Sequence, residues 1–184
     1  QKRLIGPISF FHEKKTNQGK GSCLNFIKDS INTTHVIVHD ADLEYNPSDI
    51  PELFKLAKDN PSSLILGSRV DGKAERKNIY KFLAYGTGII SYIFSKLHSY
   101  RVSDIATCYL LYPTKFLDSI SINEKGFGIE VEILSKFLKY NRSIIEHPIS
   151  YNARSYEEGK KITIMDGLLI FFKVRYISIL SSLN

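Results

Sequence analysis

The sequence predicts an α/β domain in which a largely parallel β-sheet is flanked by helices. Two observations lead to this fold class. Short runs of β-branched and aliphatic residues, typical of buried strands, alternate with longer segments whose apolar residues recur at helical spacing. The 184 residues also contain no internal repeat and no Gly/Ser linker, and a chain of this length buries one sizeable core. Residues 1–184 are therefore expected to form a single domain.

The first half of the chain is expected to hold two helices and two strands. Residues 21–31 have helical spacing, and 36–38 form a short β-branched run that predicts a buried strand. Asn46 suits the N-cap of the next helix and Pro47 its first position, since proline there loses no backbone hydrogen bond. The apolar run 64–66 predicts the second strand.

The second half is expected to continue this alternation. Residues 79–97 read as a long apolar helix, 105–112 as a strand and 143–147 as another strand that stops at a proline. Between these strands an amphipathic helix is expected at 129–140, with its inward face made of Ile133, Leu134, Phe137 and Leu138. Ligands of such folds bind at the carboxyl ends of the strands, so the residues that follow each strand are the candidates for function.

Composition excludes several classes of protein. Hydrophobic residues make up 43% and charged residues 24% of the chain, as in ordinary globular proteins and unlike disordered or collagen-like ones. The two cysteines, Cys23 and Cys108, are too few for a disulfide scaffold. They are expected to be small buried hydrophobes in a reduced cytosolic setting.

The net charge of +6 is unevenly distributed. Residues 40–59 hold six acids against two lysines, so the positive charge lies elsewhere, mainly in 69–81 and in the C-terminal third. This pattern predicts a bound cation at the acidic segment and phosphates or anionic lipid near the basic ones. A nucleic-acid role is disfavoured because the aromatic residues do not interleave with the basic stretches.

The acidic segment begins directly after the strand 36–38. If the backbone stays extended through Asp42, the carboxylates of Asp40 and Asp42 lie on one side, as a metal site requires. Hard oxygen ligands at a strand end suit Mg²⁺ or Mn²⁺ that also holds phosphates, and Glu44 is a possible third ligand. The alternative is an acidic turn that caps the next helix, because a bare Asp-x-Asp is common.

Several short blocks occur in a fixed order between about residue 17 and residue 167. Together they resemble family 2 glycosyltransferases. Within this family the resemblance is closest to the branch that acts on polyprenyl phosphates, the dolichol-phosphate mannose synthase-like enzymes. The blocks are Asn17-Gln18-Gly19-Lys20-Gly21, the segment 36–45, Gly67-Ser68-Arg69, and the segments 103–109, 126–132, 146–151 and 154–162.

The resemblance implies a Rossmann-like GT-A fold and an activity. The expected reaction is the metal-dependent, inverting transfer of a sugar from a nucleotide-sugar (GDP-mannose or a UDP-sugar) to a polyprenyl or dolichyl phosphate. Mg²⁺ or Mn²⁺ held by Asp40 and Asp42 would neutralise the departing nucleoside diphosphate. Two alternatives stay open: a family 2 enzyme with a hydroxyl acceptor in glycan synthesis, and a non-catalytic membrane-surface module.

The resemblance also assigns basic residues to the substrates. Arg154 and Lys160 would hold the acceptor phosphate, with Lys161 or Arg69 assisting, and Lys20 would lie near the donor. The alternative for Arg69 is a salt bridge to a neighbouring acid.

Two further carboxylates match positions that the family keeps acidic near the sugar and the acceptor. Asp104 is expected to orient sugar hydroxyls or basic residues. Its alternative role is that of the general base, in an enzyme whose acceptor is a hydroxyl. Glu132 is expected near the substrates, with a charge on the helix surface as its alternative.

The ends of the chain carry two more expectations. The resemblance implies that the first two strands of the family, which hold the nucleotide base, do not precede Gln1, so the domain is expected to be truncated at its N-terminus. Within residues 164–184, the apolar run 165–180 is too short and too charged to span a bilayer. The segment predicts either an interfacial helix with Lys173 and Arg175 near anionic headgroups or a core helix on the sheet. The first of these places the protein peripherally on the cytoplasmic face of a membrane.

Overall fold

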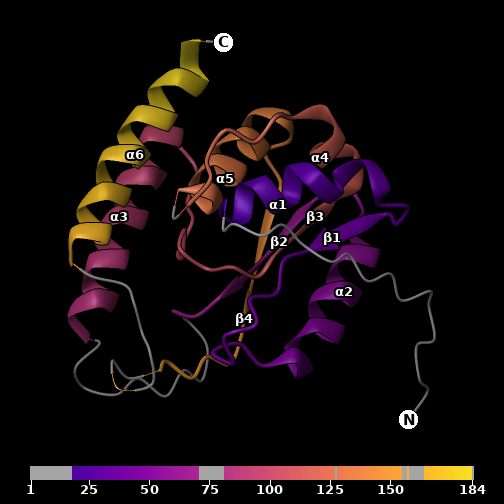
Figure 1. The fold of residues 1–184 in the computed structure, drawn as a ribbon, viewed down its shortest axis with the longest axis horizontal. Coiled ribbons are helices and arrows are strands. Elements are labelled where there is room, and N and C mark those ends of the chain that lie inside the picture. Colours follow the sequence, from indigo (N-terminus) through magenta and orange to yellow (C-terminus); the bar gives the residue numbers. More distant parts are fainter. Residues whose placement is uncertain (1–17, 71–80, 127, 155–156, 158–163, 184) are drawn as a thin grey trace.

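A computed structural model describes residues 18–70, 81–126, 128–154, 157 and 164–183 (Figure 1). The predicted sites Lys160 and Lys161 lie outside these residues. In chain order the elements are the helix α1 (Lys20–Ile27), a 3₁₀ turn (Lys28–Ser30), β1 (His35–Ile37), a second 3₁₀ turn (Pro47–Asp49), α2 (Ile50–Asp59), β2 (Leu64–Ser68), α3 (Lys81–His98), β3 (Leu110–Pro113), α4 (Thr114–Ser119), α5 (Ile129–Tyr140), β4 (Ile144–Pro148) and α6 (Ile164–Leu183).

The sheet has four strands in the order β1-β3-β2-β4. β2 and β4 are parallel, whereas β3 is antiparallel to both of its neighbours. β1, β2 and β4 therefore run in one direction, which agrees with the predicted α/β class. The reversal of β3 makes the sheet mixed.

The strand expected at 105–112 is shorter than predicted. β3 begins only at Leu110, because the residues before it turn around the buried side chain of Asp104. The helix α4 was not predicted, and α5 has the predicted bounds. The N-cap at Asn46 is confirmed, since its side chain accepts a hydrogen bond of 3.0 Å from the backbone N–H of Ser48.

Both faces of the sheet are covered. Successive residues of β2 alternate between two apolar clusters: Leu64 and Leu66 join the larger one, and Ile65 joins the smaller one beside α2. The larger cluster also contains the predicted inward face of α5, made of Ile133, Leu134, Phe137 and Leu138. The alternation of strands and helices in the sequence therefore produced the expected layers.

The helices α3 and α6 lie side by side at one side of the molecule (Figure 1). α6 contributes Val174 and Ile177 to the core, as the core-helix alternative requires, yet it also leaves Phe172 and Tyr176 largely exposed. None of the helices within the described residues is long and apolar enough to cross a bilayer.

The two cysteines differ in their surroundings. Cys108 is buried, as expected, but Cys23 is exposed. The prediction for Cys23 is wrong because α1 lies at the margin of the fold and buries only Gly21 and Leu24.

A candidate active site at the carboxyl ends of β1, β2 and β4

Four segments meet at one edge of the sheet. They are the segments that follow β1, β2 and β4, and the segment that precedes β3. They meet there because β3 runs opposite to the other three strands. Asp42, Arg69, Asp104 and Arg154, which the sequence singled out, all lie in these segments and are linked there through side-chain contacts.

The acidic segment after β1 turns instead of staying extended. The carboxylate of Asp42 accepts a 3.1 Å hydrogen bond from the backbone N–H of Glu44, and Leu43 between them has a φ of 63°. Such a turn ends the alternation of an extended strand, so the reason given from the sequence for placing both carboxylates on one side does not apply. Asp40 and Asp42 instead contact different cations.

Asp40 pairs with Lys20. The amino group of Lys20 lies 3.1 Å from the carboxylate of Asp40 and 2.8 Å from that of Glu130 on α5. Burial lowers the pKa of Lys20, but the carboxylates of Glu130 and Asp40 outweigh it and hold the pKa well above its ordinary value. Lys20 is therefore a fixed positive charge beside the acidic segment; its contact with the donor stays a prediction.

Gly19 makes this position of Lys20 possible. It precedes α1 with a φ of 83°, and a Cβ atom there would lie 1.9 Å from the carbonyl oxygen of Lys125. Only glycine fits so close to another backbone at a positive φ. The Gly-rich segment therefore serves close packing at the start of α1.

Arg154 pairs with the other two acids of the segment. Its guanidinium lies 3.4 Å from a carboxylate oxygen of Asp42 and 3.3 Å from one of Glu44. Its backbone N–H also donates to Glu44 at 3.0 Å, and the hydroxyl of Tyr151 donates to the second oxygen of Glu44. Glu44 is thus buried with both carboxylate oxygens occupied.

Arg69 and Asp104 form a second, deeper ion pair. Two guanidinium nitrogens of Arg69 lie 2.8 Å and 2.7 Å from the two oxygens of Asp104, and the backbone N–H of Arg69 adds a bond of 3.0 Å. Burial raises the pKa of Asp104, but Arg69 outweighs it and holds the pKa below its ordinary value. The structure thus contains the salt bridge considered for Arg69, and Asp104 orients a basic residue, as the sequence suggested.

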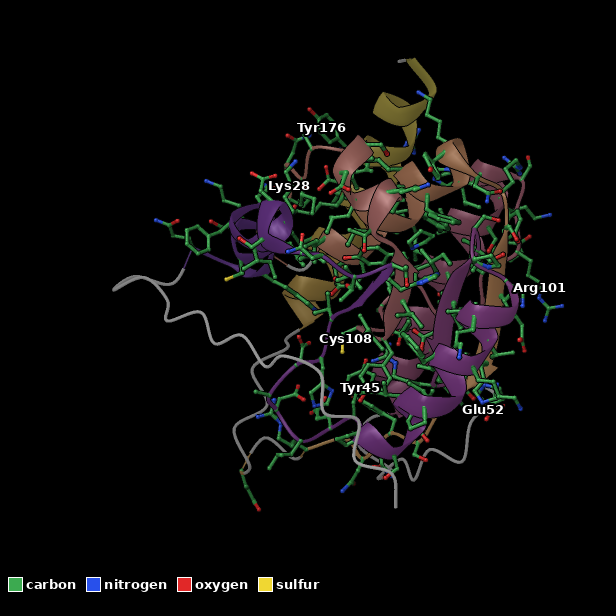
Figure 2. The ribbon with its side chains drawn as sticks, turned by 90° about the vertical axis from the view of Figure 1, so that its right-hand side faces the viewer. Lys28, Tyr45, Glu52, Arg101, Cys108 and Tyr176 are labelled. Carbon is green, nitrogen blue, oxygen red and sulfur yellow. The ribbon has the colours of Figure 1, made fainter. Side chains whose placement is uncertain are left out.

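An aromatic cluster joins the two ion pairs. The guanidinium of Arg69 lies 5.0 Å from the ring centroid of Tyr151, whose hydroxyl contacts Glu44. Tyr45 packs between the rings of Tyr151 and Tyr109, and its hydroxyl accepts a 3.0 Å hydrogen bond from the backbone N–H of Cys108 (Figure 2). This cluster was missed from the sequence, because tyrosines spread over the chain carry no spacing that brings them together.

Glu132 does not face this site. Only 3% of its surface is exposed, and its carboxylate accepts hydrogen bonds from the backbone N–H groups of Asn123 and Glu124 and from Lys136. The surface charge expected as the alternative for Glu132 is therefore wrong, because the buried carboxylate holds the segment before α5. Its place near the substrates stays a prediction. The acid of α5 that reaches the site is Glu130, through Lys20.

The oxygen ligands fit a divalent cation only in part. Within the described residues no group of three His, Cys, Asp or Glu side chains is arranged to hold a metal ion. The side chains of Asp40 and Asp42 are 38% and 26% exposed, so both can offer hard oxygens to a cation that keeps water and takes further oxygens from phosphates. Glu44 does not join them, since its oxygens are already bonded to Arg154 and Tyr151.

Comparison with known proteins agrees with this geometry. Residues 2–120 match the sequence family described as Glycosyl transferase family 2. The chain is 30% identical over 145 residues to a dolichol-phosphate mannosyltransferase of Pyrococcus furiosus, in an alignment that covers 77% of this chain and 39% of that protein.

Solved structures share the fold. Glucosyl-3-phosphoglycerate synthase from Mycobacterium tuberculosis in complex with UDP gives a TM-score of 0.61 at 14% identity, covering 87% of this chain and 55% of that one. The same enzyme with Mn²⁺, UDP-glucose and phosphoglyceric acid gives a TM-score of 0.60 at 13% identity, with the same coverage. The chain thus spans only 39% and 55% of the length of these relatives. The family match over residues 2–120 shows that the chain belongs to glycosyltransferase family 2.

Proposed function

We propose that this chain is the catalytic body of a glycosyltransferase that moves a sugar from a nucleotide-sugar to a polyprenyl or dolichyl phosphate, with inversion, at the cytoplasmic surface of a membrane. One observation carries the proposal: the guanidinium of Arg154 lies against Asp42 in the acidic loop, on the edge of the sheet where ligands of α/β folds bind. The positive charge of Arg154, suited to an acceptor phosphate, thus lies beside the carboxylate of Asp42, which is suited to the metal ion of the donor. The mannosyltransferase relative supports this class of acceptor.

The state of Asp104 favours a phosphate acceptor over a hydroxyl acceptor. Transfer breaks the bond between the anomeric carbon and the diphosphate and forms a bond to an acceptor oxygen. A phosphate monoester is already anionic at neutral pH, so its oxygen attacks without a general base and needs cations that position it. Asp104, the base considered from the sequence, is fully buried and bonded to Arg69, which leaves it unsuited to take a proton from a hydroxyl.

Each charged residue of the site would have one role in the reaction. Arg154 would hold the acceptor phosphate, together with Lys160 and Lys161, and Lys20 would face the donor from beside Asp40. Asp40 and Asp42 would hold Mg²⁺ or Mn²⁺, which when bound neutralises the charge of the departing diphosphate. The structure of the fold relative with Mn²⁺ and UDP-glucose supports this choice of metal.

Asp42→Asn in the intact protein tests the proposal. Transfer of labelled sugar from GDP-mannose and from UDP-glucose to a polyprenyl phosphate in detergent, with Mg²⁺ or Mn²⁺, is the measurement. The variant removes a charged oxygen ligand, so kcat/KM is expected to fall by about a hundredfold or more. Asp118→Asn, an exposed acid on α4, is the matched control and should leave transfer unchanged. Unchanged transfer in Asp42→Asn would refute the metal role, and transfer to a hydroxyl acceptor in place of the polyprenyl phosphate would refute the acceptor.

A further inference from the structure

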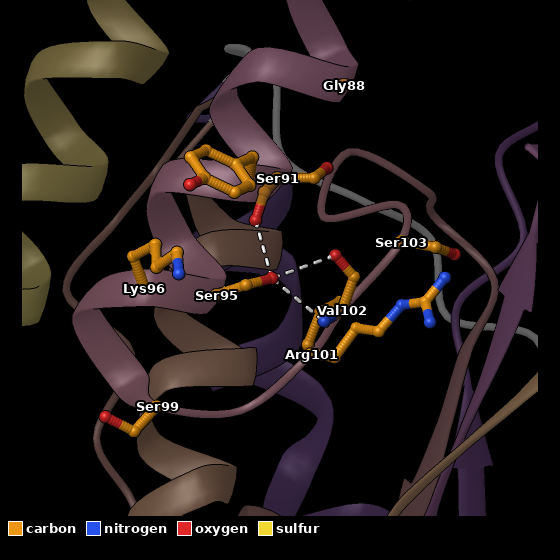
Figure 3. A pocket seen from close by; sticks show the side chains of 9 residues that line it. Gly88, Ser91, Ser95, Lys96, Ser99, Arg101, Val102 and Ser103 are labelled. Carbon is orange, nitrogen blue, oxygen red and sulfur yellow. Dashed lines mark hydrogen bonds between the residues drawn. The ribbon is translucent and has the colours of Figure 1, made fainter.

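A groove of about 630 Å³ runs along α3, apart from the contacts of the candidate site. One wall is α3 between Gly88 and Ser99, and the other is the loop 101–103 (Figure 3). The hydroxyl of Ser95 ties the two walls together, since it donates to the carbonyl of Val102 and accepts from its N–H. The groove is therefore a built feature of the fold.

The groove is positively charged. Lys96 projects from the helix wall and Arg101 from the loop wall (Figure 3). Both side chains are exposed, and neither has a carboxylate partner within the described part of the chain. Arg142 adds a third positive charge nearby, where its guanidinium donates to the carbonyls of His98 and Ser99 at the end of α3. Two acids border the loop: Glu146 accepts hydrogen bonds from the backbone N–H and the hydroxyl of Ser103, and Asp104, the next residue, is bonded to Arg69.

The helices beside the groove expose apolar side chains at helical spacing. On α3 these are Tyr85, Ile89 and Tyr92, which are 74%, 60% and 63% exposed, and Lys96 continues the same face one turn on. On α6, which packs against α3, the exposed apolar side chains are Leu169, Phe172 and Tyr176. Tyrosine rings with a polar tip, next to lysine and arginine, are typical of surfaces that lie at a membrane interface.

We propose that this groove binds the phosphate of an anionic phospholipid headgroup while the exposed faces of α3 and α6 enter the bilayer interface. Two exposed cations on facing walls, which have no carboxylate partner among the described residues, complement a lipid phosphate; Lys96 also lies over the ring of Tyr92, 5.4 Å from its centroid. The adjacent aromatic and aliphatic side chains suit the region just beneath the phosphate. The inference deepens the proposed function, since a polyprenyl acceptor stays in the bilayer and the enzyme has to meet it there. The vesicle binding that tests it needs no donor, metal or acceptor.

Co-sedimentation of the intact protein with vesicles tests the inference. Vesicles of phosphatidylcholine alone are compared with vesicles that also contain phosphatidylglycerol. Binding to the anionic vesicles is expected, and Lys96→Ala/Arg101→Ala should lower the partition coefficient by about 30-fold, or roughly fivefold for each charge removed. The matched control is Lys58→Ala/Lys115→Ala, which removes two exposed charges from α2 and α4 and should bind like the wild type. Equal losses in both variants would show general charge attraction and overturn the groove site.

Two further measurements separate other occupants from a bilayer. Inorganic phosphate that binds in the groove, while the double variant still binds anionic vesicles normally, would assign the groove to free phosphate and overturn the proposal. Ile89→Asp and Phe172→Asp should each weaken vesicle binding. If they instead dissociate a dimer in sedimentation velocity and leave vesicle binding intact, the face is an interface between copies of the chain.

The outcomes also distinguish this inference from the proposed function. Lys96→Ala/Arg101→Ala should keep its sugar transfer in detergent to a short-chain polyprenyl phosphate. Vesicle binding without any transfer would refute the proposed function alone. Transfer in detergent without vesicle binding would refute the inference alone.

Discussion

Two arginine–carboxylate pairs at the same edge of the sheet have different surroundings. Arg69 and Asp104 are joined at 2.7 Å, and their side chains are 15% and 1% exposed. Arg154 lies 3.4 Å from Asp42, and their side chains are 35% and 26% exposed. The first pair is short, two-pronged and buried, whereas the second is long and reached by water.

This difference separates a structural pair from a pair that can exchange partners. Removing one member of a buried pair leaves an uncompensated charge without solvent, which is costly. A half-exposed pair is screened by water and contributes little to stability. The pair of Arg154 and Asp42 can therefore separate at little cost, as the proposed binding of a phosphate and a cation requires, while Arg69 and Asp104 keep the surrounding backbone in place.

The largest expected effect is that of Arg69→Ala on stability. The carboxylate of Asp104 would stay buried without its partner, so the free energy of unfolding is expected to fall by about 3–5 kcal/mol. Urea denaturation measures this change. Arg175→Ala, an exposed arginine on α6, is the control and should change little. A loss in Arg69→Ala as small as that of the control would show that the pair is not structural.

The pH dependence of stability sharpens the same point. Arg69 holds the pKa of Asp104 in the folded protein below its ordinary value. The contribution of this pair to the free energy of unfolding is therefore complete above the unfolded pKa of about 3.9. It is lost as the pH falls through the lower pKa of the folded protein. In Arg69→Ala the guanidinium no longer opposes burial, and only the backbone N–H groups of residue 69 and Ala106 still lower the pKa of Asp104, so this pKa rises and protonation on acidification relieves the buried charge. The difference in unfolding free energy between wild type and Arg69→Ala should therefore shrink from neutral pH toward about pH 4.

Denaturant curves at several pH values measure this convergence. In the background of Asp104→Asn, which carries no titrating carboxyl at this position, the effect of Arg69→Ala should not depend on pH in this range. A difference that grows on acidification would contradict the assigned pairing.

The smallest expected effect on stability is that of Arg154→Ala. Asp42 is 26% exposed, and the buried Glu44 keeps its bonds to Tyr151 and to the backbone N–H of residue 154, so the free energy of unfolding should change by no more than about 1 kcal/mol. Transfer should nevertheless fall, chiefly through a raised KM for the polyprenyl phosphate, by roughly tenfold or more, because a charge-assisted contact to the acceptor is lost. Steady-state kinetics in detergent measure this, with Arg154→Lys expected to keep part of the affinity. A stability loss as large as that of Arg69→Ala would place both arginines in the same structural role.

Much of the fold follows from local patterns in the sequence. The helix at Ile129–Tyr140 was predicted with its inward face because four apolar residues recur at helical spacing. The strand β2 was predicted because an apolar run of its length has to be buried on both faces. The direction of β3 was not predictable, since the direction of a strand depends on which neighbours it pairs with.

The sequence predicted most of the residues of the candidate site but few of the contacts between them. Asp40, Asp42, Arg69, Asp104 and Arg154 were named because they follow strands or match family blocks, and the structure gathers them. The burial of Glu132 and the contact of Glu130 with Lys20 were not predicted, because residues two apart on a helix point to different sides and the sequence did not show which side faced the site.

The sequence by itself determined the family, the order of the strands and of the helices other than α4, and the edge of the sheet at which the charged residues after β1, β2 and β4 lie. Each of these depends on neighbours in the chain or on periodic burial, which a sequence records directly. The tertiary structure alone decided which charges are buried and paired: Asp104 with Arg69, Glu44 with Arg154 and Tyr151, and Lys20 between Asp40 and Glu130. These partners lie on segments far apart in the chain, and only packing brings them within bonding distance and removes the water that would otherwise screen them.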